Sequence, residues 1–235
     1  MRVLAIVHQR DAGPGVFAEA IRSRGVELDS WLQTEDHSPP RDPGDYDAVL
    51  IFGGAMHADQ EEEHPWLHGE RALLAELVER SVPLLGVCLG AQLLAQAAGG
   101  EARRAPEPEI GWHGVSLTPE GADDPLLAPL SSGFVAFQWH SYEFSLPTGA
   151  TPLATSPVCL QAYRLAGPAW GIQFHAEVTP QDAEKWIHEY REDEDAVRIG
   201  VDQRSLRERT RYRIGAWNEL GRGLCKRFLD LATRG

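Results

Sequence analysis

Short apolar runs alternate with amphipathic segments through the first hundred residues of the chain. The apolar runs have the length of buried strands, and the segments between them carry apolar residues at helical spacing. The strand-like runs are residues 3–7, 26–32, 47–52 and 82–87, and the helix-like segments are residues 15–24, 66–80 and 89–98. Such an alternation predicts an α/β fold with a doubly wound, mostly parallel sheet.

The pattern changes after the glycine pair Gly99-Gly100. Residues 103–110 are rich in proline and charge, a turn and a short helix are expected at 119–130, and the strand-like runs are 111–118, 134–144, 152–154, 159–165 and 171–177. Shorter and closer runs indicate an antiparallel extension of the sheet. Thr179-Pro180 is typical of a helix start, and Leu220, Leu224, Phe228 and Leu231 follow helical spacing. We therefore expect one domain over residues 1–235, with a helical C-terminal extension at about 179–235.

Composition narrows the class of protein. The chain is 43% hydrophobic and 24% charged, which is ordinary globular usage, and it holds only three cysteines. No apolar run is long enough to span a membrane, and no signal-peptide pattern is present, so we expect a cytoplasmic protein. The net charge of −13 argues against binding to nucleic acid or to an anionic membrane. The net charge does not exclude binding of small anionic substrates, because they respond to the local charge of a site.

Cys88 stands at the junction around which the chain is organised. It lies in Gly86-Val87-Cys88-Leu89-Gly90, between a strand-like run and a helix-like segment. A strand that turns directly into a helix strains the central residue and requires small neighbours. The helix N-terminus would favour a thiolate at Cys88, which is the nucleophilic form. The alternative is that Cys88 is simply a small buried residue.

A second motif supplies a matching base. Residues 171–177 form an apolar strand-like run that ends in His175-Ala176-Glu177. Residues two apart on a strand point the same way, so Glu177 can hydrogen-bond one ring nitrogen of His175. The other nitrogen is then free to take a proton from Cys88, which is the arrangement of a catalytic triad.

A glycine pair follows the third predicted strand. Gly53-Gly54 lies at a carboxyl strand end, where parallel sheets place their ligand sites, as do Cys88 and His175. Backbone N–H groups without a neighbouring Cβ can approach a substrate closely. They could stabilise the oxyanion that forms when a thiolate attacks an amide. An ordinary tight turn is the alternative interpretation.

These motifs together resemble those of the class I, or triad, glutamine amidotransferase family. The resemblance rests on GVCLGAQ, GIQFHAE, LIFGGAMHADQ and QWHSYEF, which occur in the family's order, and it is closest to stand-alone proteins of the GMP synthase amidotransferase-like kind. It implies a flavodoxin-like amidotransferase fold and a Cys88-His175-Glu177 triad that hydrolyses the side-chain amide of glutamine. It further implies oxyanion donors at Gly54 and Leu89 and substrate contacts at Gln92, Ser141 and Tyr142. This chemistry requires no metal and no organic cofactor.

The chain departs from the family pattern in places. Ala176 replaces the proline usual between the triad histidine and glutamate, and Ala55 replaces a proline that often follows the glycine pair. Neither residue supplies the chemistry. The chain also shows no P-loop and no synthetase domain that would consume ammonia. Either a separate synthetase subunit receives the ammonia, or the protein acts alone.

Several residues compete for functional roles. His140 is a rival to His175 as base, but only His175 has an acid two residues away. A metal site built from a histidine- and acid-containing loop is disfavoured, because that loop holds no compact ligand motif. The loop residues are His57, Asp59, His64 and His68. We interpret Cys159 as structural and the acidic run at 191–195 as exposed surface.

Three functions remain open on the sequence. A glutamine amidotransferase would release ammonia from glutamine and respond to a synthetase partner. A stand-alone γ-glutamyl hydrolase would act on γ-glutamyl peptides or amides without one. A regulatory protein that kept the fold without catalysis is the weakest alternative, because Cys88, His175 and Glu177 are all present.

Overall fold

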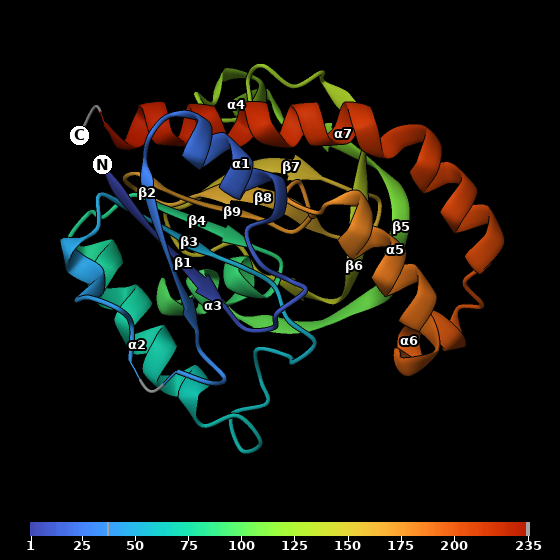
Figure 1. Ribbon diagram of the computed structural model, residues 1–235, viewed down its shortest axis with the longest axis horizontal. Coiled ribbons are helices and arrows are strands. Elements are labelled where there is room, and N and C mark those ends of the chain that lie inside the picture. Colours follow the sequence, from blue (N-terminus) through green and yellow to red (C-terminus); the bar gives the residue numbers. More distant parts are fainter. Residues whose placement is uncertain (37, 234–235) are drawn as a thin grey trace.

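A single nine-stranded sheet runs through the computed structural model, which describes residues 1–36 and 38–233 (Figure 1). The strand order is β2-β1-β3-β4-β9-β8-β7-β5-β6. Strands β2, β1, β3, β4 and β9 are parallel, and β8, β7, β5 and β6 continue the sheet in antiparallel pairs. The bounds are β1 Arg2–Val7, β2 Glu27–Leu32, β3 Ala48–Ile51, β4 Leu84–Val87, β5 Ala102–Leu117, β6 Gly133–Phe144, β7 Thr151–Thr155, β8 Leu160–Arg164 and β9 Ala169–Ile172.

Helices cover both faces of the parallel part of the sheet. Val3, Ala5 and Val7 of β1 pack with α1 and α7, whereas Leu4 and Ile6 belong to the core beneath α2 and α3. A strand buried on both faces needs apolar residues at every position, which is why these runs are continuous. The helices are α1 Gly15–Ser23, α2 Trp66–Glu79, α3 Leu89–Ala97 and α7 Gln203–Ala232. The predicted doubly wound sheet with an antiparallel extension is confirmed.

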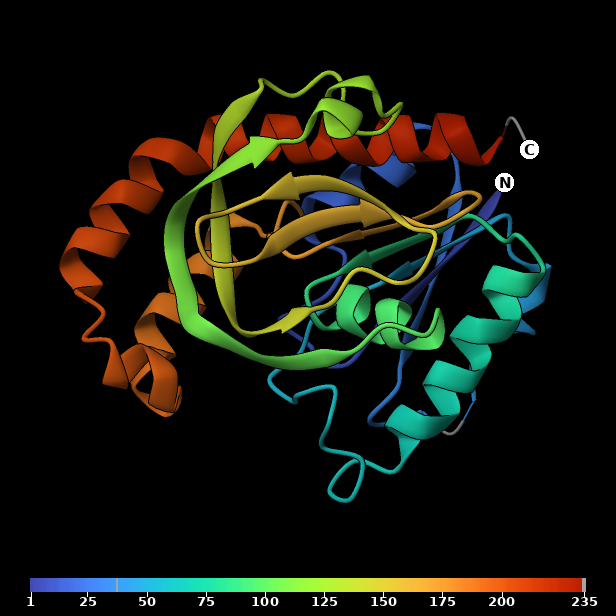
Figure 2. The ribbon, with the colours of Figure 1, turned by 180° about the vertical axis from the view of Figure 1, so that it is seen from behind.

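Strand β5 begins earlier than the sequence indicates. We predicted no strand over residues 103–110, yet β5 starts at Ala102 and curves around the antiparallel end of the sheet as the long green strand of Figure 2. Its pairing with β6 shifts register between Arg104 and Glu109. Pro106 and Pro108 fall in this irregular stretch, where no ladder hydrogen bond from their nitrogens is required. Proline therefore marks a bulge in β5 and not a loop.

The segment after β9 is helical. Thr179 caps α5 through a reciprocal pair of hydrogen bonds with Asp182. The helical elements here are α5 Pro180–Glu189, η2 Tyr190–Glu192 and α6 Glu194–Arg198, and the shorter elements elsewhere are η1 Pro43–Asp45 and α4 Pro119–Asp123. The loop expected at 34–45 includes residue 37, which lies outside the described residues. Within residues 1–36 and 38–233, no helix combines the length and apolarity that crossing a bilayer would need.

The acidic run at 191–195 is exposed, as predicted, at Arg191, Glu192 and Glu194, but not at Asp193 and Asp195. Asp195 is buried and pairs with Arg104 of β5, and the Asp193 carboxylate accepts a hydrogen bond of 2.8 Å from the Trp139 indole. Because a single sequence does not reveal which charges meet across the fold, the run resembled an ordinary solvated segment. These ion pairs and hydrogen bonds attach α6 to the antiparallel strands.

Candidate active site

Cys88 occupies a strained turn between β4 and α3. Its backbone angles are φ 53° and ψ −112°, a conformation that residues with a Cβ rarely adopt. A Cβ on Gly86 would lie 2.6 Å from the carbonyl oxygen of Gly90, and one on Gly90 would lie 2.2 Å from that of Ile51. Both glycines are therefore required for the turn, as the sequence predicted. The turn presents the thiol at the N-terminus of α3, where N–H groups and the helix dipole favour negative charge.

His175 and Glu177 form a buried pair. The His175 Nδ1 lies 2.7 Å from the Glu177 carboxylate, so the ring donates to it through Nδ1. We predicted this pair from strand geometry, and that premise is wrong: β9 ends at Ile172, three residues before His175. The side chains instead meet on an irregular segment, residues 173–178, whose backbone is attached to β6 by a hydrogen bond of 2.9 Å from His175 N to Phe137 O.

Helix α7 holds this irregular segment from the other side. The Trp217 indole donates to the His175 carbonyl at 2.8 Å, and the Asn218 amide donates to the Val178 carbonyl at 2.8 Å. A Cβ on Gly221 would lie only 2.0 Å from the carbonyl oxygen of Ala176. Gly221 is thus the point of closest approach between α7 and the segment that carries His175 and Glu177.

The surroundings of His175 favour its protonated form. Burial alone would lower its pKa, but the charges of Glu177 and of a Cys88 thiolate outweigh burial and raise the pKa of His175 to about 10. Its Nε2 has no hydrogen-bond partner among the residues that the structure describes. Cys88 and His175 line the same cavity. This arrangement suits a thiolate beside an imidazolium that can release its Nε2 proton to a substrate.

A pH titration tests this electrostatic arrangement. Because the pKa of His175 is raised from 6.5 to about 10, its protonation stabilises the folded protein; that contribution is complete below about pH 6.5 and is lost as pH rises through about 10. NMR of the imidazole ring should show a midpoint near 10 in the wild type. Cys88→Ala and Glu177→Gln should each lower the midpoint, since each removes a negative charge. A wild-type midpoint near 6.5 would contradict the arrangement.

The glycine pair after β3 lies against Cys88 and His175. A Cβ on Gly53 would be 3.2 Å from His175 Cε1 and 3.6 Å from Cys88 Cβ. Neither the Gly54 nor the Leu89 N–H donates a hydrogen bond within the described part of the chain. Both donors are therefore available to an oxyanion next to Cys88, although the role of these N–H groups stays a prediction.

A buried pair that the sequence analysis missed supports this turn. His8 Nδ1 lies 3.0 Å from the Phe52 carbonyl oxygen, and Nε2 lies 2.9 Å from the Glu70 carboxylate. Since both partners accept, both ring nitrogens donate and His8 carries a positive charge; the Glu70 charge outweighs burial and raises the pKa of His8. The position of His8 directly after β1, at the carboxyl edge of the sheet, was the available signal.

Cys88 and His175 line a cavity of about 490 Å³. Ser141, Tyr142 and Gln92 line it, as the resemblance implied. Tyr142 stacks on His57 at 4.1 Å and donates through its hydroxyl to Asp59. The Gln92 amide nitrogen donates to the Tyr142 carbonyl and to the Gln173 side chain. Gln92 is thus placed to hold the Tyr142 backbone, and its contact with substrate remains a prediction.

One wall of the cavity comes from the C-terminal helices. Acidic residues dominate this wall, and Arg104, which also lines the cavity, is paired with Asp195. The acidic residues of the cavity are Asp11, Glu189, Glu192, Asp193, Glu194 and Asp195. The Trp186 ring contacts the His175 ring edge-to-face at 4.9 Å. Sequence reasoning missed this wall because the run looked exposed.

His140 lines the same cavity as Cys88, but its side chain belongs to a second buried cluster with Glu109 and Cys159. Burial and the Glu109 charge raise the pKa of the Cys159 thiol to about 12, so Cys159 is poorly suited to act as a nucleophile. The His140 Nδ1 donates to the Tyr142 carbonyl at 2.9 Å. The rival base therefore has a different set of partners from those of His175.

Comparison with known proteins agrees with the fold and the motifs. A family model described as glutamine amidotransferase class-I matches residues 15–190. A glutamine amidotransferase-like protein of Salmonella typhimurium, YfeJ, is 30% identical over 99% of this chain and 98% of its own length. A solved glutamine amidotransferase from Thermotoga maritima superposes with a TM-score of 0.88 at 30% identity, covering 100% of this chain and 99% of that one.

Two further relatives have more specific names. A glutamine-hydrolysing GMP synthase subunit of Ignicoccus hospitalis is 35% identical over 60% of this chain and 71% of its own length. A γ-glutamyl-L-1-hydroxyisopropylamide hydrolase of a Pseudomonas species is 30% identical over 64% of this chain and 56% of its own length. The family model covers most of the chain, and the Salmonella relative covers nearly all of it. This protein belongs to the class I glutamine amidotransferase family.

Proposed function

We propose that the protein hydrolyses the side-chain amide of glutamine to glutamate and ammonia through a γ-glutamyl thioester on Cys88. The observation that carries the proposal is the meeting of a strained thiol with a buried His175–Glu177 pair in one cavity. Membership of an amidotransferase family supports this chemistry. We further propose that residues 1–235 act as one domain, because α7 of the C-terminal extension holds the segment that carries His175.

The first half of the reaction forms the thioester. The Cys88 thiolate attacks the γ-carbonyl carbon, a C–S bond forms, and negative charge moves to the carbonyl oxygen. The N–H groups of Gly54 and Leu89 would stabilise this oxyanion. The imidazolium of His175 then gives its Nε2 proton to the amide nitrogen, the C–N bond breaks and ammonia leaves.

The second half releases glutamate. Neutral His175, oriented by Glu177, accepts a proton from water as the water oxygen attacks the thioester carbon. The C–S bond breaks, glutamate departs, and the thiolate–imidazolium pair is restored. Protons and electrons balance over the cycle within Cys88, His175, water and the substrate, so the steps need no redox partner.

A second candidate is hydrolysis of γ-glutamyl amides whose leaving amine is larger than ammonia. Glu192 and Glu194 favour it, because their exposed carboxylates line the cavity and would attract a cationic amine. The Pseudomonas relative is named for a γ-glutamyl amide substrate. Relatives named as synthase subunits favour the first candidate, in which a separate synthetase subunit would receive the ammonia.

A substrate panel separates the two candidates. The purified chain is incubated with L-glutamine, γ-glutamyl peptides and γ-glutamyl amides of neutral and cationic amines, with Cys88→Ala as control. Cys88-dependent release of ammonia from glutamine supports the amidotransferase proposal. A much higher kcat/KM for γ-glutamyl amides of cationic amines selects the second candidate. No Cys88-dependent turnover of any γ-glutamyl compound would refute both.

A further inference from the structure

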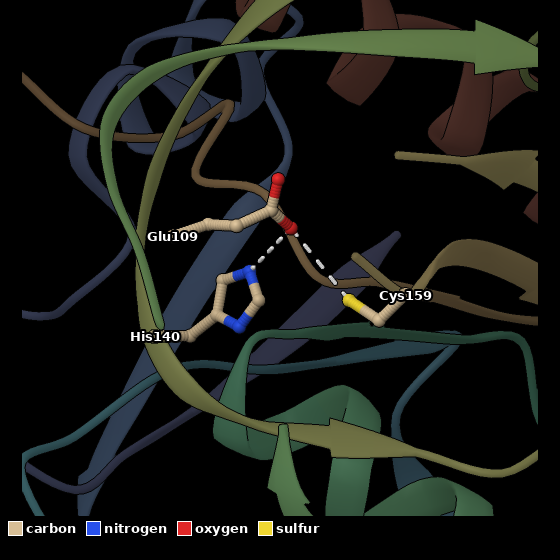
Figure 3. Close-up of side chains that lie close together, drawn as sticks. All are labelled: Glu109, His140 and Cys159. Carbon is tan, nitrogen blue, oxygen red and sulfur yellow. Dashed lines mark hydrogen bonds and ion pairs between the residues drawn. The ribbon is translucent and has the colours of Figure 1, made fainter. Parts of the chain in front are cut away.

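Three metal-binding residue types converge beside the cavity, which one of them, His140, also lines. Glu109 comes from β5, His140 from β6 and Cys159 from the turn before β8, and all three are buried. One ligand atom from each lies within 4.8 Å of the others. Figure 3 shows the three side chains directed toward a common point, with the Glu109 carboxylate between the histidine and the cysteine.

The tautomer of His140 leaves its other ring nitrogen, Nε2, without a hydrogen bond in the part of the chain that the structure describes. Its Nδ1 lies 2.9 Å from the Tyr142 carbonyl oxygen, which can only accept, so Nδ1 carries the proton. Nε2 is completely buried and has no hydrogen-bond partner among the described residues. A metal-binding histidine has the same arrangement, with one nitrogen fixed by a backbone carbonyl and the other directed at the ion.

The separations within the cluster, which include a weak S–H···O hydrogen bond and an ion pair, are also compatible with a bound cation. The Nε2 of His140 is 3.4 Å from Glu109 Oε2, and the Cys159 sulfur is 3.7 Å from the same oxygen. Zinc binds nitrogen, oxygen and sulfur at about 2.0–2.3 Å in a tetrahedron, whose edges are therefore about 3.3–3.7 Å. Both separations match tetrahedron edges.

Surrounding side chains orient the carboxylate. Ser156 Oγ and Gln161 Nε2 donate to Glu109 Oε2 at 2.8 and 2.7 Å, and the Gln161 amide lies 3.3 Å from the Cys159 sulfur. The Gln161 oxygen accepts a hydrogen bond from the Gln138 amide, which fixes the orientation of the Gln161 side chain.

We propose that Glu109, His140 and Cys159 bind a divalent late first-row metal ion, zinc being the best match to a thiolate, an imidazole and a carboxylate. On binding, the Cys159 thiol transfers its proton to solvent and the sulfur bonds the metal. The ion would join β5, β6 and the start of β8. It would thereby fix the part of β6 that carries Ser141 and Tyr142 into the cavity, so its role is structural and the reaction at Cys88 does not pass through it.

Cobalt(II) titration of the whole chain tests the proposal. Cys88→Ala serves as the parent protein, because it removes the other thiol that neighbours a histidine. We expect one equivalent of Co²⁺ to give a thiolate-to-cobalt absorption band with tetrahedral d–d bands, and Zn²⁺ to displace it. Adding Cys159→Ser should abolish the thiolate band and weaken Zn²⁺ binding at least 100-fold. Cys225→Ser, at a buried thiol outside the cluster, should leave the thiolate band and the affinity for Zn²⁺ unchanged.

A second variant, Glu109→Gln, tests the proposal independently if Cys159→Ser does not fold. Glu109→Gln keeps the size of the side chain and should also weaken Zn²⁺ binding strongly, and Zn²⁺ should raise the melting temperature of the parent but not of either variant. Absence of Co²⁺ binding, binding without a thiolate band, or a band that survives Cys159→Ser would each overturn the proposal.

Discussion

Replacing Cys88 by alanine is expected to lower the rate of γ-glutamyl amide hydrolysis by about 10⁴-fold or more, because no other nucleophile is positioned to form the thioester. Substrate binding and the oxyanion donors would remain. The melting temperature should not fall, because a methyl group fits where the thiol was and the backbone strain at φ 53° is unchanged. Initial rates and thermal unfolding, measured on the same preparation, check both parts.

Cys225→Ala is the matched control for loss of a thiol. Cys225 is fully buried in α7, and its sulfur lies 3.7 Å from the Phe17 carbonyl oxygen, away from the cavity. Its replacement should leave the rate within a few-fold of the wild type. If Cys88→Ala kept a tenth or more of the wild-type rate, Cys88 would not be the nucleophile.

Gly221→Ala is expected to destabilise the fold by about 3 kcal/mol and to reduce activity in the protein that remains folded. The new Cβ would lie 2.0 Å from the Ala176 carbonyl oxygen, between His175 and Glu177. Either α7 or the segment 173–178 must move, and a movement of the segment disturbs the His175–Glu177 pair. Urea unfolding gives the stability change, and kcat of the folded fraction gives the effect on the site.

Gly215→Ala in the same helix is the control. A Cβ there meets no atom within 4 Å, so the substitution should stabilise α7 by up to about 1 kcal/mol through helix propensity. Stability changes of opposite sign for Gly221→Ala and Gly215→Ala would show that the contact with Ala176, and not helix propensity, decides the effect at Gly221. Equal effects at both positions would argue against the contact.

The parallel half of the fold could be predicted from the sequence because it depends on residues that are close together in the chain. Each buried strand is a continuous apolar run, and the glycines around Cys88 are required by a turn whose strain depends on adjacent residues. The same reasoning located His175 and Glu177, although through a strand that ends earlier than predicted. Their pairing depends on Phe137 and Trp217, which are distant in sequence.

The rest of the site depends on contacts between distant segments. The pairing of Arg104 with Asp195 makes an apparently solvated acidic run into a cavity wall, and the approach of α7 to Ala176 explains a glycine that local propensity disfavours. Strand β5 pairs with β6 on both sides of the prolines near residue 106, although prolines in the sequence suggest a loop. None of these contacts leaves a pattern in a single sequence, because each is decided by which elements meet.

Covalent trapping of the nucleophile tests the central claim most directly. The diazo carbon of a diazoketone analogue of L-glutamine would take a proton from the His175 imidazolium, and the Cys88 thiolate would then displace dinitrogen. The product is a stable thioether that intact-mass spectrometry and peptide mapping can locate. We predict one label per chain, on Cys88, with loss of activity in proportion, and no label on Cys88→Ala. A label on Cys159 or Cys225, or an unlabelled chain that still hydrolyses γ-glutamyl amides, would contradict this mechanism.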